Sequence, residues 1–350
     1  MVLLSIILNL SAMDHRIPVT LLTGFLGSGK TTLLNKLLSH ANMKDTAVII
    51  NELGEEGLDH ILAQNVDSSY VADNAVLLQN GCLCCTLSNE LADTMRDLYF
   101  KRSMEAIPQF NRLVIETTGM ADPGPIMANL MNEPVIESVY RLDAVIVTID
   151  AMYGVQQLAE HDEARKQAAV ADVLLITKTD IATPEQTSAL KENLIRINPG
   201  ATQHKVLNGE IDPDFIIDVG LFDPTGKRAE PERWLRAPLK PASNLGGKLP
   251  TPHQDEISSF SVTLPTGISW KSVKPVLLKL CQTHGEQLLR LKGILHVDDQ
   301  PHPLAIHAVH FTPYPATLLI DWKEDAPTSR VVCIGKRLDE AAIRKMLTQL

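Results

Sequence analysis

Residues 17–40, IPVTLLTGFLGSGKTTLLNKLLSH, give the strongest indication of the fold of this 350-residue chain. Residues 17–24 are apolar and β-branched, which predicts a strand, and residues 31–40 have the apolar spacing of a helix. Between them GFLGSGKTT, residues 24–32, matches the pattern G-x-x-x-x-G-K-[ST]. A glycine loop between a strand and a helix is the setting of a phosphate-binding loop, so nucleotide binding is predicted; an ordinary glycine turn is the alternative.

Each part of this loop has an expected role. Glycines let successive backbone N–H groups turn toward phosphate oxygens, and the start of the helix adds its positive dipole end. Lys30 is expected to reach the β- and γ-phosphates, and the Thr31 hydroxyl to ligate Mg²⁺. The predicted nucleotide-binding residues of the loop are Gly24, Gly27, Ser28, Gly29, Lys30, Thr31 and Thr32.

A second apolar run, RLVIET at residues 112–117, offers the acidic group that a magnesium site needs. Its Glu116 resembles the acid of a Walker B strand, with Glu in place of the usual Asp. Gly119 can offer its N–H to a γ-phosphate. Lys30, Thr31 and Glu116 are therefore the predicted catalytic residues, and Thr31 and Glu116 the predicted magnesium ligands. A solvated glutamate at a strand end is the alternative.

The stretch LLITKTD, residues 174–180, bears on the choice of base. GTPases place N-K-x-D at the end of a late strand, where the Asp accepts hydrogen bonds from guanine and the Lys stem covers the ring. Asp180 and Lys178 are predicted to do the same. Thr177 replaces the Asn, so the loss of one amide contact and looser selectivity are expected. GTP is predicted over ATP, with an ATP-dependent kinase as a weaker alternative.

The rest of the chain predicts two domains. Apolar runs at 46–51, 112–117, 143–150 and 172–178, alternating with helical stretches at 88–100, 155–170 and 184–197, indicate an α/β domain with a mainly parallel sheet flanked by helices. The expected boundaries are an N-terminal extension at 1–15, a nucleotide-binding domain at 16–222, a proline-rich linker at 223–255 and a smaller α+β domain at 256–350.

The expected elements of the α+β domain are strands around 257–265, 293–299, 306–314, 317–322 and 330–336, a helix at 270–291 and a terminal helix at 339–350. At the other end of the chain, the apolar run after Met1 spans about ten residues, too short for a bilayer. A secretory signal requires a basic residue before its apolar run, and this run has none. Translation from Met13 is an alternative start.

Composition narrows the class of protein. The net charge of −10 argues against a protein that coats nucleic acid or an anionic membrane. The five cysteines are odd in number and mostly clustered, which does not fit a disulfide framework. Reduced thiols predict a cytoplasmic protein. Cys281 and Cys333 lie in helix and strand patterns and are expected in a core.

The cluster NGCLCCTL, residues 80–87, places three thiols within four positions. Cys82, Cys84 and Cys85 are soft ligands suited to Zn²⁺ or Cu⁺, and coordination would deprotonate them. A fourth ligand is not obvious: Glu52, Glu55, His60, water or a nucleotide-dependent group are candidates. Buried inert thiols and metal-free redox sensing are the alternatives. The histidines His296, His302, His307 and His310 are expected to be scattered surface residues.

Taken together, TGFLGSGKTTLLNKLL, NELGEEGLD, NGCLCC, LVIETTGMADPGPI and LLITKTD resemble the CobW family of P-loop GTPases, relatives of HypB and UreG. The YjiA-like branch is the most similar. LLRLKGIL (288–295) and VVCIGKRLD (331–339) resemble the family's C-terminal domain. The resemblance covers residues 17–350 and leaves the N-terminal extension unmatched.

The resemblance implies a metallochaperone that binds Zn²⁺, with Co²⁺ or another transition metal as alternatives, and hydrolyses GTP slowly. It implies zinc ligation by Cys82, Cys84 and Cys85, with Glu52 and Glu55 matching the acidic segment. GTP/GDP, Mg²⁺, a metal ion and a client metalloprotein are the expected partners, without nucleic acid or membrane. Monomer and homodimer both stay open. The alternative function is a zinc-binding regulator that nucleotide stabilises and that has no productive GTPase cycle.

Overall fold

The computed structural model describes residues 15–51, 76–80, 87–216, 219, 257–319 and 328–350. The chain forms two compact units. One unit contains residues 15–191 and 202–220, and the other contains the remaining residues. The boundaries predicted from the sequence at 16–222, 223–255 and 256–350 are finer than this division and stay predictions.

The first unit is built on a parallel sheet. Among the described residues its strand order is β3-β2-β4-β1-β5-β6-β7, and every neighbouring pair is parallel. The strands are β1 (Ile17–Gly24), β2 (Thr46–Asn51), β3 (Val76–Asn80), β4 (Arg112–Glu116), β5 (Tyr140–Asp150), β6 (Val173–Thr177) and β7 (Thr202–Lys205). Nearly every residue of β1, β4 and β6 is buried, as expected for a sheet covered on both faces.

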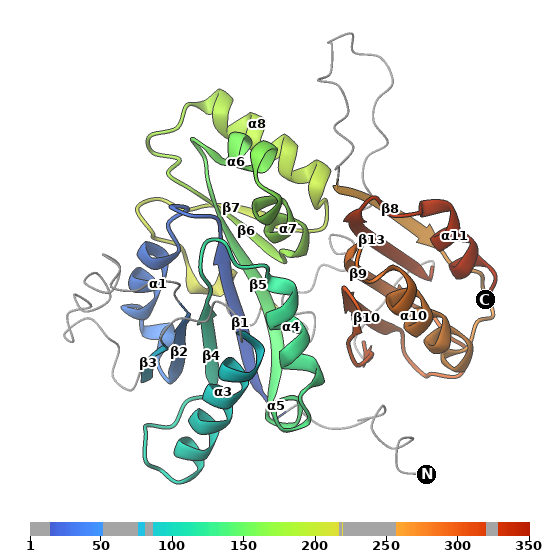
Figure 1. The fold of residues 1–350 in the computed structure, drawn as a ribbon, viewed down its shortest axis with the longest axis horizontal. Coiled ribbons are helices and arrows are strands. Elements are labelled where there is room, and N and C mark those ends of the chain that lie inside the picture. The colour runs from blue at the N-terminus through green and yellow to red at the C-terminus, as the bar shows by residue number, and fades with distance from the viewer. Residues whose placement is uncertain (1–14, 52–75, 81–86, 217–218, 220–256, 320–327) are drawn as a thin grey trace. The chain divides into compact units, whose positions relative to one another are not determined.

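Helices flank this sheet (Figure 1). They are α1 (Lys30–Leu38), α3 (Leu87–Ser103), α4 (Pro123–Asn132), α5 (Pro134–Val139), α6 (Gly154–Glu160), α7 (Asp162–Val170) and α8 (Pro184–Ile197). The leucines of α1, among them Leu33 and Leu37, pack with Leu22, Val48 and Val114 of three strands. The predicted α/β class with a parallel sheet is confirmed.

The first unit differs from the prediction in two ways. The helix expected at 155–170 is two helices, because His161 has an extended backbone (φ −118°, ψ 123°) that ends α6 and starts α7. The sequence did not predict β3, β7, α4 or α5. The strand β7, TQHK, is polar and only partly buried, so it carries no hydrophobic signal of a strand.

Besides residues 192–201, which include the last residues of α8, the second unit contains an antiparallel sheet with two helices. Its order is β11-β10-β9-β13-β8, and β12 pairs with β10. The strands are β8 (Ile257–Thr263), β9 (Leu288–Leu295), β10 (Leu304–Val309), β11 (Thr312–Pro313), β12 (Thr317–Leu318) and β13 (Arg330–Lys336). The helices are α10 (Trp270–His284) and α11 (Glu340–Thr348). This confirms the predicted smaller α+β domain.

The prediction of a helix over 270–291 was wrong at its end. The helix α10 stops at His284, and residues 288–291 begin β9. All eight residues of β9 are buried, Arg290 and Lys292 included, so it lacks the alternation of buried and exposed residues that would have separated it from the end of the helix. The core of this unit contains Leu280, Cys281, Leu291 and Cys333, which confirms the core placement of both cysteines.

Candidate functional site

The loop between β1 and α1 has the backbone of a phosphate cradle. Gly24, Gly27 and Gly29 have positive φ values of 146°, 69° and 92°, which favour glycine. A Cβ on Gly24 would lie 2.3 Å from the Thr148 hydroxyl and 2.4 Å from the Thr148 carbonyl oxygen. The loop therefore needs glycine at its first position for space as well as for conformation.

Lys30 folds back over this loop. Its buried Nζ donates hydrogen bonds to the carbonyl oxygens of Gly24 at 2.8 Å and Phe25 at 3.2 Å. A cation held inside the loop, together with the N-terminus of α1, creates a positive concavity. The arrangement fits the polyphosphate of a nucleotide.

Thr31 and Glu116 meet at the adjacent strand end. The Thr31 hydroxyl donates to Oε1 of Glu116 at 3.0 Å, and the glutamate is 3% exposed. Thr31 lies in the first turn of α1, which follows β1, and Glu116 ends β4, where its register partner on β1 is Leu22. A hydroxyl and a carboxylate are the hard oxygen ligands that Mg²⁺ prefers, so these residues fit the ion.

The segment after β4 packs against the phosphate loop. The Thr117 N–H donates to the Leu22 carbonyl at 3.0 Å, and its hydroxyl donates to that of Thr23 at 2.7 Å. A Cβ on Gly119 would lie 2.6–2.8 Å from side-chain and backbone atoms of Leu26. A side chain at position 119 would push this segment away from the loop.

Thr177 joins the predicted guanine motif to the phosphate loop. Its hydroxyl is within hydrogen-bond distance of the Ser28 carbonyl at 2.8 Å and the Ile149 carbonyl at 3.2 Å. The threonine that replaces Asn therefore has a structural partner in the loop. The looser base selectivity expected from this replacement stays a prediction.

Asp150 is a site residue that the sequence reasoning missed. Its carboxylate pairs with Nζ of Lys178 at 2.7 Å and accepts from the Met152 N–H at 2.8 Å. Asp150 is 1% exposed, whereas Asp180 lies exposed in the turn after β6. β5 ends in an acid as β4 does, so Asp150 shows the same signal in the sequence as Glu116, an acid at the end of an apolar strand.

The predicted zinc ligands Glu52, Glu55, Cys82, Cys84 and Cys85 lie outside the described residues. The strands that precede them are described. β2 ends at Asn51 and β3 at Asn80, and these two asparagines are register partners on neighbouring parallel strands. Ile50 of β2 is in turn the partner of Glu116. Both strands therefore end at the edge of the sheet that carries the Thr31–Glu116 pair.

Among the described residues, no group of three or more His, Cys, Asp or Glu side chains is arranged to hold a metal ion. None of their helices is long and apolar enough to cross a membrane.

Comparison with known proteins places this architecture. Residues 18–205 match the family described as "CobW/HypB/UreG, nucleotide-binding domain", and residues 257–350 match "Cobalamin synthesis protein cobW C-terminal domain". The chain belongs to the CobW/HypB/UreG family. The family resemblance predicted from the sequence is confirmed.

Individual relatives agree with this membership. This CobW/HypB/UreG chain is 38% identical to the zinc chaperone YjiA of Escherichia coli K12 over 336 residues, which cover 94% of the chain and 96% of YjiA. It is 30% identical to the zinc chaperone CobW of Pseudomonas aeruginosa, covering 95% and 91% of the two chains. The solved structure "Zn(II)-bound YjiA GTPase from E. coli" matches with a TM-score of 0.68 and 33% identity, covering 95% and 98%.

A eukaryotic relative matches over a shorter region. The "Zinc-regulated GTPase metalloprotein activator 1" of Schizosaccharomyces pombe is 34% identical over 209 residues, which cover 59% of this chain and 50% of the relative.

Proposed function

We propose that this protein is a GTP-hydrolysing zinc chaperone, in which the nucleotide state controls how the metal is held. The relatives that it matches along nearly its whole length are named zinc chaperones. The observation that carries the proposal for this chain is the phosphate cradle of β1 and α1, with Thr31 and Glu116 3.0 Å apart beside it.

In the proposed site, the loop from Gly24 to Thr32 binds the phosphates, and Lys30 exchanges its loop carbonyls for phosphate oxygens. Thr31 and Glu116 hold Mg²⁺, which when bound neutralises phosphate charge during transfer to water. Asp180 and Lys178 read guanine. Gly119 offers its N–H toward the γ-phosphate. Hydrolysis is expected to be slow because the sequence contains no recognisable arginine finger or water-orienting glutamine.

The positions of Asn51 and Asn80 support coupling between nucleotide and metal. The residues that follow them include Glu52 and the cysteine motif, which we propose as the zinc site. Partners on neighbouring parallel strands lie about 4.8 Å apart, so Asn51 and Asn80, the residues that precede these segments, lie close together and near Glu116. A change at the magnesium position can therefore reach both segments over a short path.

The partner and the location are part of the same proposal. We propose that the protein delivers its metal ion to an unidentified client metalloprotein. We also propose that it is located in the cytoplasm, where thiolate ligands stay reduced. By thermodynamic linkage, if GTP tightens zinc binding, zinc tightens GTP binding by the same factor.

The test is a Zn²⁺ competition titration of the metal-free chain with a non-hydrolysable GTP analogue, with GDP and without nucleotide. The matched variant is Cys82→Ser/Cys84→Ser/Cys85→Ser, and the control is Cys281→Ser in the other unit. We expect tight binding that depends on the clustered cysteines and changes severalfold between the GTP and GDP forms.

The other outcomes separate the alternatives. Cysteine-dependent binding that ignores the nucleotide would favour the zinc-binding regulator and would contradict the coupled chaperone. Binding that the triple variant does not weaken would remove the cysteine motif from the proposal.

A further inference from the structure

One helix, α7, contacts the segment that carries Gly119. The side chain of Gln167 is buried, and its Nε2 donates to the carbonyl oxygens of Gly119 at 3.1 Å and Ala121 at 3.0 Å. Gln167 also lines a small cavity together with Phe25 and Thr148, which belong to the surroundings of the phosphate loop. A single amide thus holds two backbone groups of the segment after β4.

The neighbouring residue of α7 makes a second link. Nζ of Lys166 contacts the Asp122 carboxylate at 2.8 Å, and the other oxygen of that carboxylate accepts from the Gly124 N–H at 2.9 Å. Burial lowers the pKa of Lys166, but the hydrogen bond and charge of Asp122, with Asp162 and Glu163, outweigh it and leave the pKa raised. Lys166 therefore stays charged at neutral pH.

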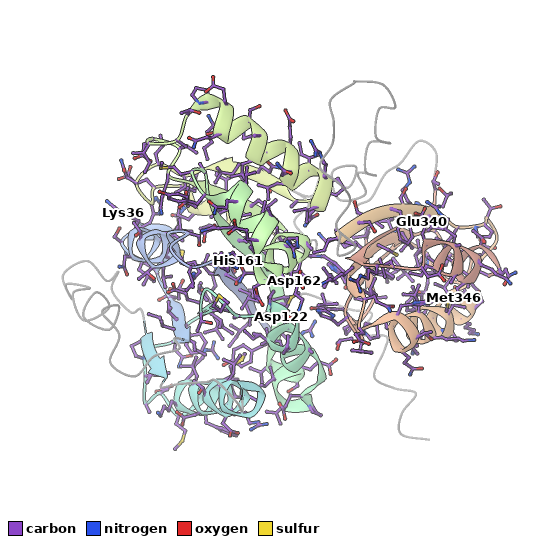
Figure 2. The ribbon with its side chains drawn as sticks, turned by 45° about the horizontal axis from the view of Figure 1, so that its top comes forward. Lys36, Asp122, His161, Asp162, Glu340 and Met346 are labelled. Atoms are coloured by element: carbon purple, nitrogen blue, oxygen red, sulfur yellow. The ribbon has the colours of Figure 1, made fainter. Side chains whose placement is uncertain are left out.

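The start of α7 touches the phosphate loop itself. The ring of His161, which precedes the helix, stacks on Phe25 with centroids 4.5 Å apart. The Phe25 carbonyl is one of the two that hold Lys30. Figure 2 labels His161 and Asp162 at this end of α7, together with Asp122 of the segment after β4. The helix therefore contacts both loops of the proposed nucleotide site.

We propose that Gln167 is a positioning residue that holds the Gly119 segment closed against the phosphate loop, ready for a γ-phosphate. This rests on the proposed nucleotide site. Gly119 already lies against Leu26, where a Cβ would clash, so the braced conformation is the one packed on the loop. Fixing the carbonyls of Gly119 and Ala121 restricts the backbone that presents the Gly119 N–H.

The direction of the effect follows from the ligand. GTP has a γ-phosphate to meet Gly119 and GDP has none, so the brace contributes to GTP binding and hydrolysis but little to GDP binding. Without the Gln167 amide, the carbonyls of Gly119 and Ala121 lose its hydrogen bonds, and the Gly119 segment can move away from the phosphate loop. GTP affinity then falls because the ordering of the segment occurs on binding.

The experiment compares the full-length chain with Gln167→Met, which keeps the length of the side chain and removes the donor. Dissociation constants for a non-hydrolysable GTP analogue and for GDP are measured with Mg²⁺, beside single-turnover hydrolysis. We expect the analogue to bind about fivefold to tenfold more weakly, with GDP unchanged within about twofold. Hydrolysis is expected to slow in parallel.

The matched control is Gln203→Met. Gln203 also donates to a backbone carbonyl, that of Lys191 at 3.4 Å, but it joins β7 to α8 instead of the Gly119 segment. It should leave the ratio of GTP to GDP affinity unchanged. Lys166→Met, at a partly exposed ion pair, should lower the same ratio by a smaller factor.

A ratio that stays at the wild-type value in Gln167→Met, or that falls equally in the control, would overturn the positioning role. If Gln167→Met does not fold, Gln167→Ala decides by the same ratio, because it removes the donor without placing a charge in this buried site. Failure of the wild-type chain to bind either nucleotide would instead contradict the proposed function.

Discussion

The strands of the two sheets differ in where they end. In the parallel sheet Gly24, Glu116, Asp150 and Thr177 end four different strands, and because those strands run in one direction, the four residues share one edge. In the antiparallel sheet neighbouring strands end at opposite edges. Strand direction therefore decides which unit gathers distant segments of sequence into one site.

The buried charges follow the same division. Lys30 and Glu116 are buried beside the phosphate loop, where Lys30 donates to the Gly24 carbonyl and Glu116 accepts from Thr31. Arg290 and Lys292 are also buried, but they lie in the middle of β9. We therefore expect substitutions at the edge where the parallel strands end to change mainly ligand affinity. Substitutions in the antiparallel unit should change mainly stability.

The largest effect is expected for Lys30→Met. Removing the ammonium takes away a charge-assisted contact to phosphate, so affinity for GTP and GDP should fall about 100-fold or more. Fluorescent nucleotide titration measures it. The control is Lys36→Met on the same helix, whose exposed side chain pairs with Glu210 at 3.5 Å. Equal nucleotide affinities of wild type and Lys30→Met would contradict the assignment of ligand binding to this edge of the parallel sheet.

The next effect is expected for Asp150→Asn. The change removes the carboxylate that holds Lys178 at 2.7 Å, so guanine nucleotide affinity should fall about tenfold, with about 1–3 kcal/mol of stability lost. Nucleotide titration and urea unfolding measure both.

Asp143→Asn serves as the control for this change, because Asp143 is a buried acid on the same strand that pairs with Arg141 at 3.3 Å. It should lower stability and leave nucleotide affinity within about twofold of wild type. Loss of affinity in both variants would mean that damage to β5 in general causes the effect.

In the antiparallel unit, Cys333→Ser should affect stability alone. A hydroxyl replaces a fully buried thiol in an apolar core, which should lower the free energy of unfolding by about 1–3 kcal/mol. Nucleotide and zinc affinities should not change. Cys333→Ala, which adds no polar atom, separates polarity from lost volume. A change in zinc affinity in either variant would contradict the division between the two units.

The last prediction concerns stability at alkaline pH. Burial raises the pKa of Cys281 and of Cys333 to about 12, whereas a thiol in the unfolded chain titrates near pH 8.5. The unfolded chain therefore holds fewer of these protons above pH 8.5, and stability falls as pH rises toward 12. The thiol contribution is complete below pH 8.5.

Each thiol can contribute up to about 1.4 kcal/mol per pH unit within that window. Urea unfolding of wild type and of Cys281→Ala/Cys333→Ala between pH 8 and pH 10.5 measures it. The double variant should have the flatter slope. Parallel slopes would show that the two thiols titrate alike in the folded and unfolded chains.

Most strands and helices of the first unit were predictable, because fully apolar runs bounded by glycine or polar residues have few alternatives. The bounds of β1, at Ile17–Gly24, and of α8, at Pro184–Ile197, match the predicted ranges. The failures have local causes. His161 breaks a continuous helical pattern with one extended residue. β9 is buried along its whole length, Arg290 and Lys292 included, so burial does not alternate along it as it does in a strand with one exposed face.

The phosphate loop and the family could be predicted from the sequence, because both depend on residue types at fixed short spacings. Lys30 follows Gly24 by six positions and Thr31 follows it by seven, and a loop this short can adopt few conformations. Tertiary structure alone decided that Thr177 bonds to Ser28, that Asp150 holds Lys178, and that Gln167 braces Gly119. Those pairs are separated by long stretches of chain, and only the order and common direction of the strands bring them within hydrogen-bond distance.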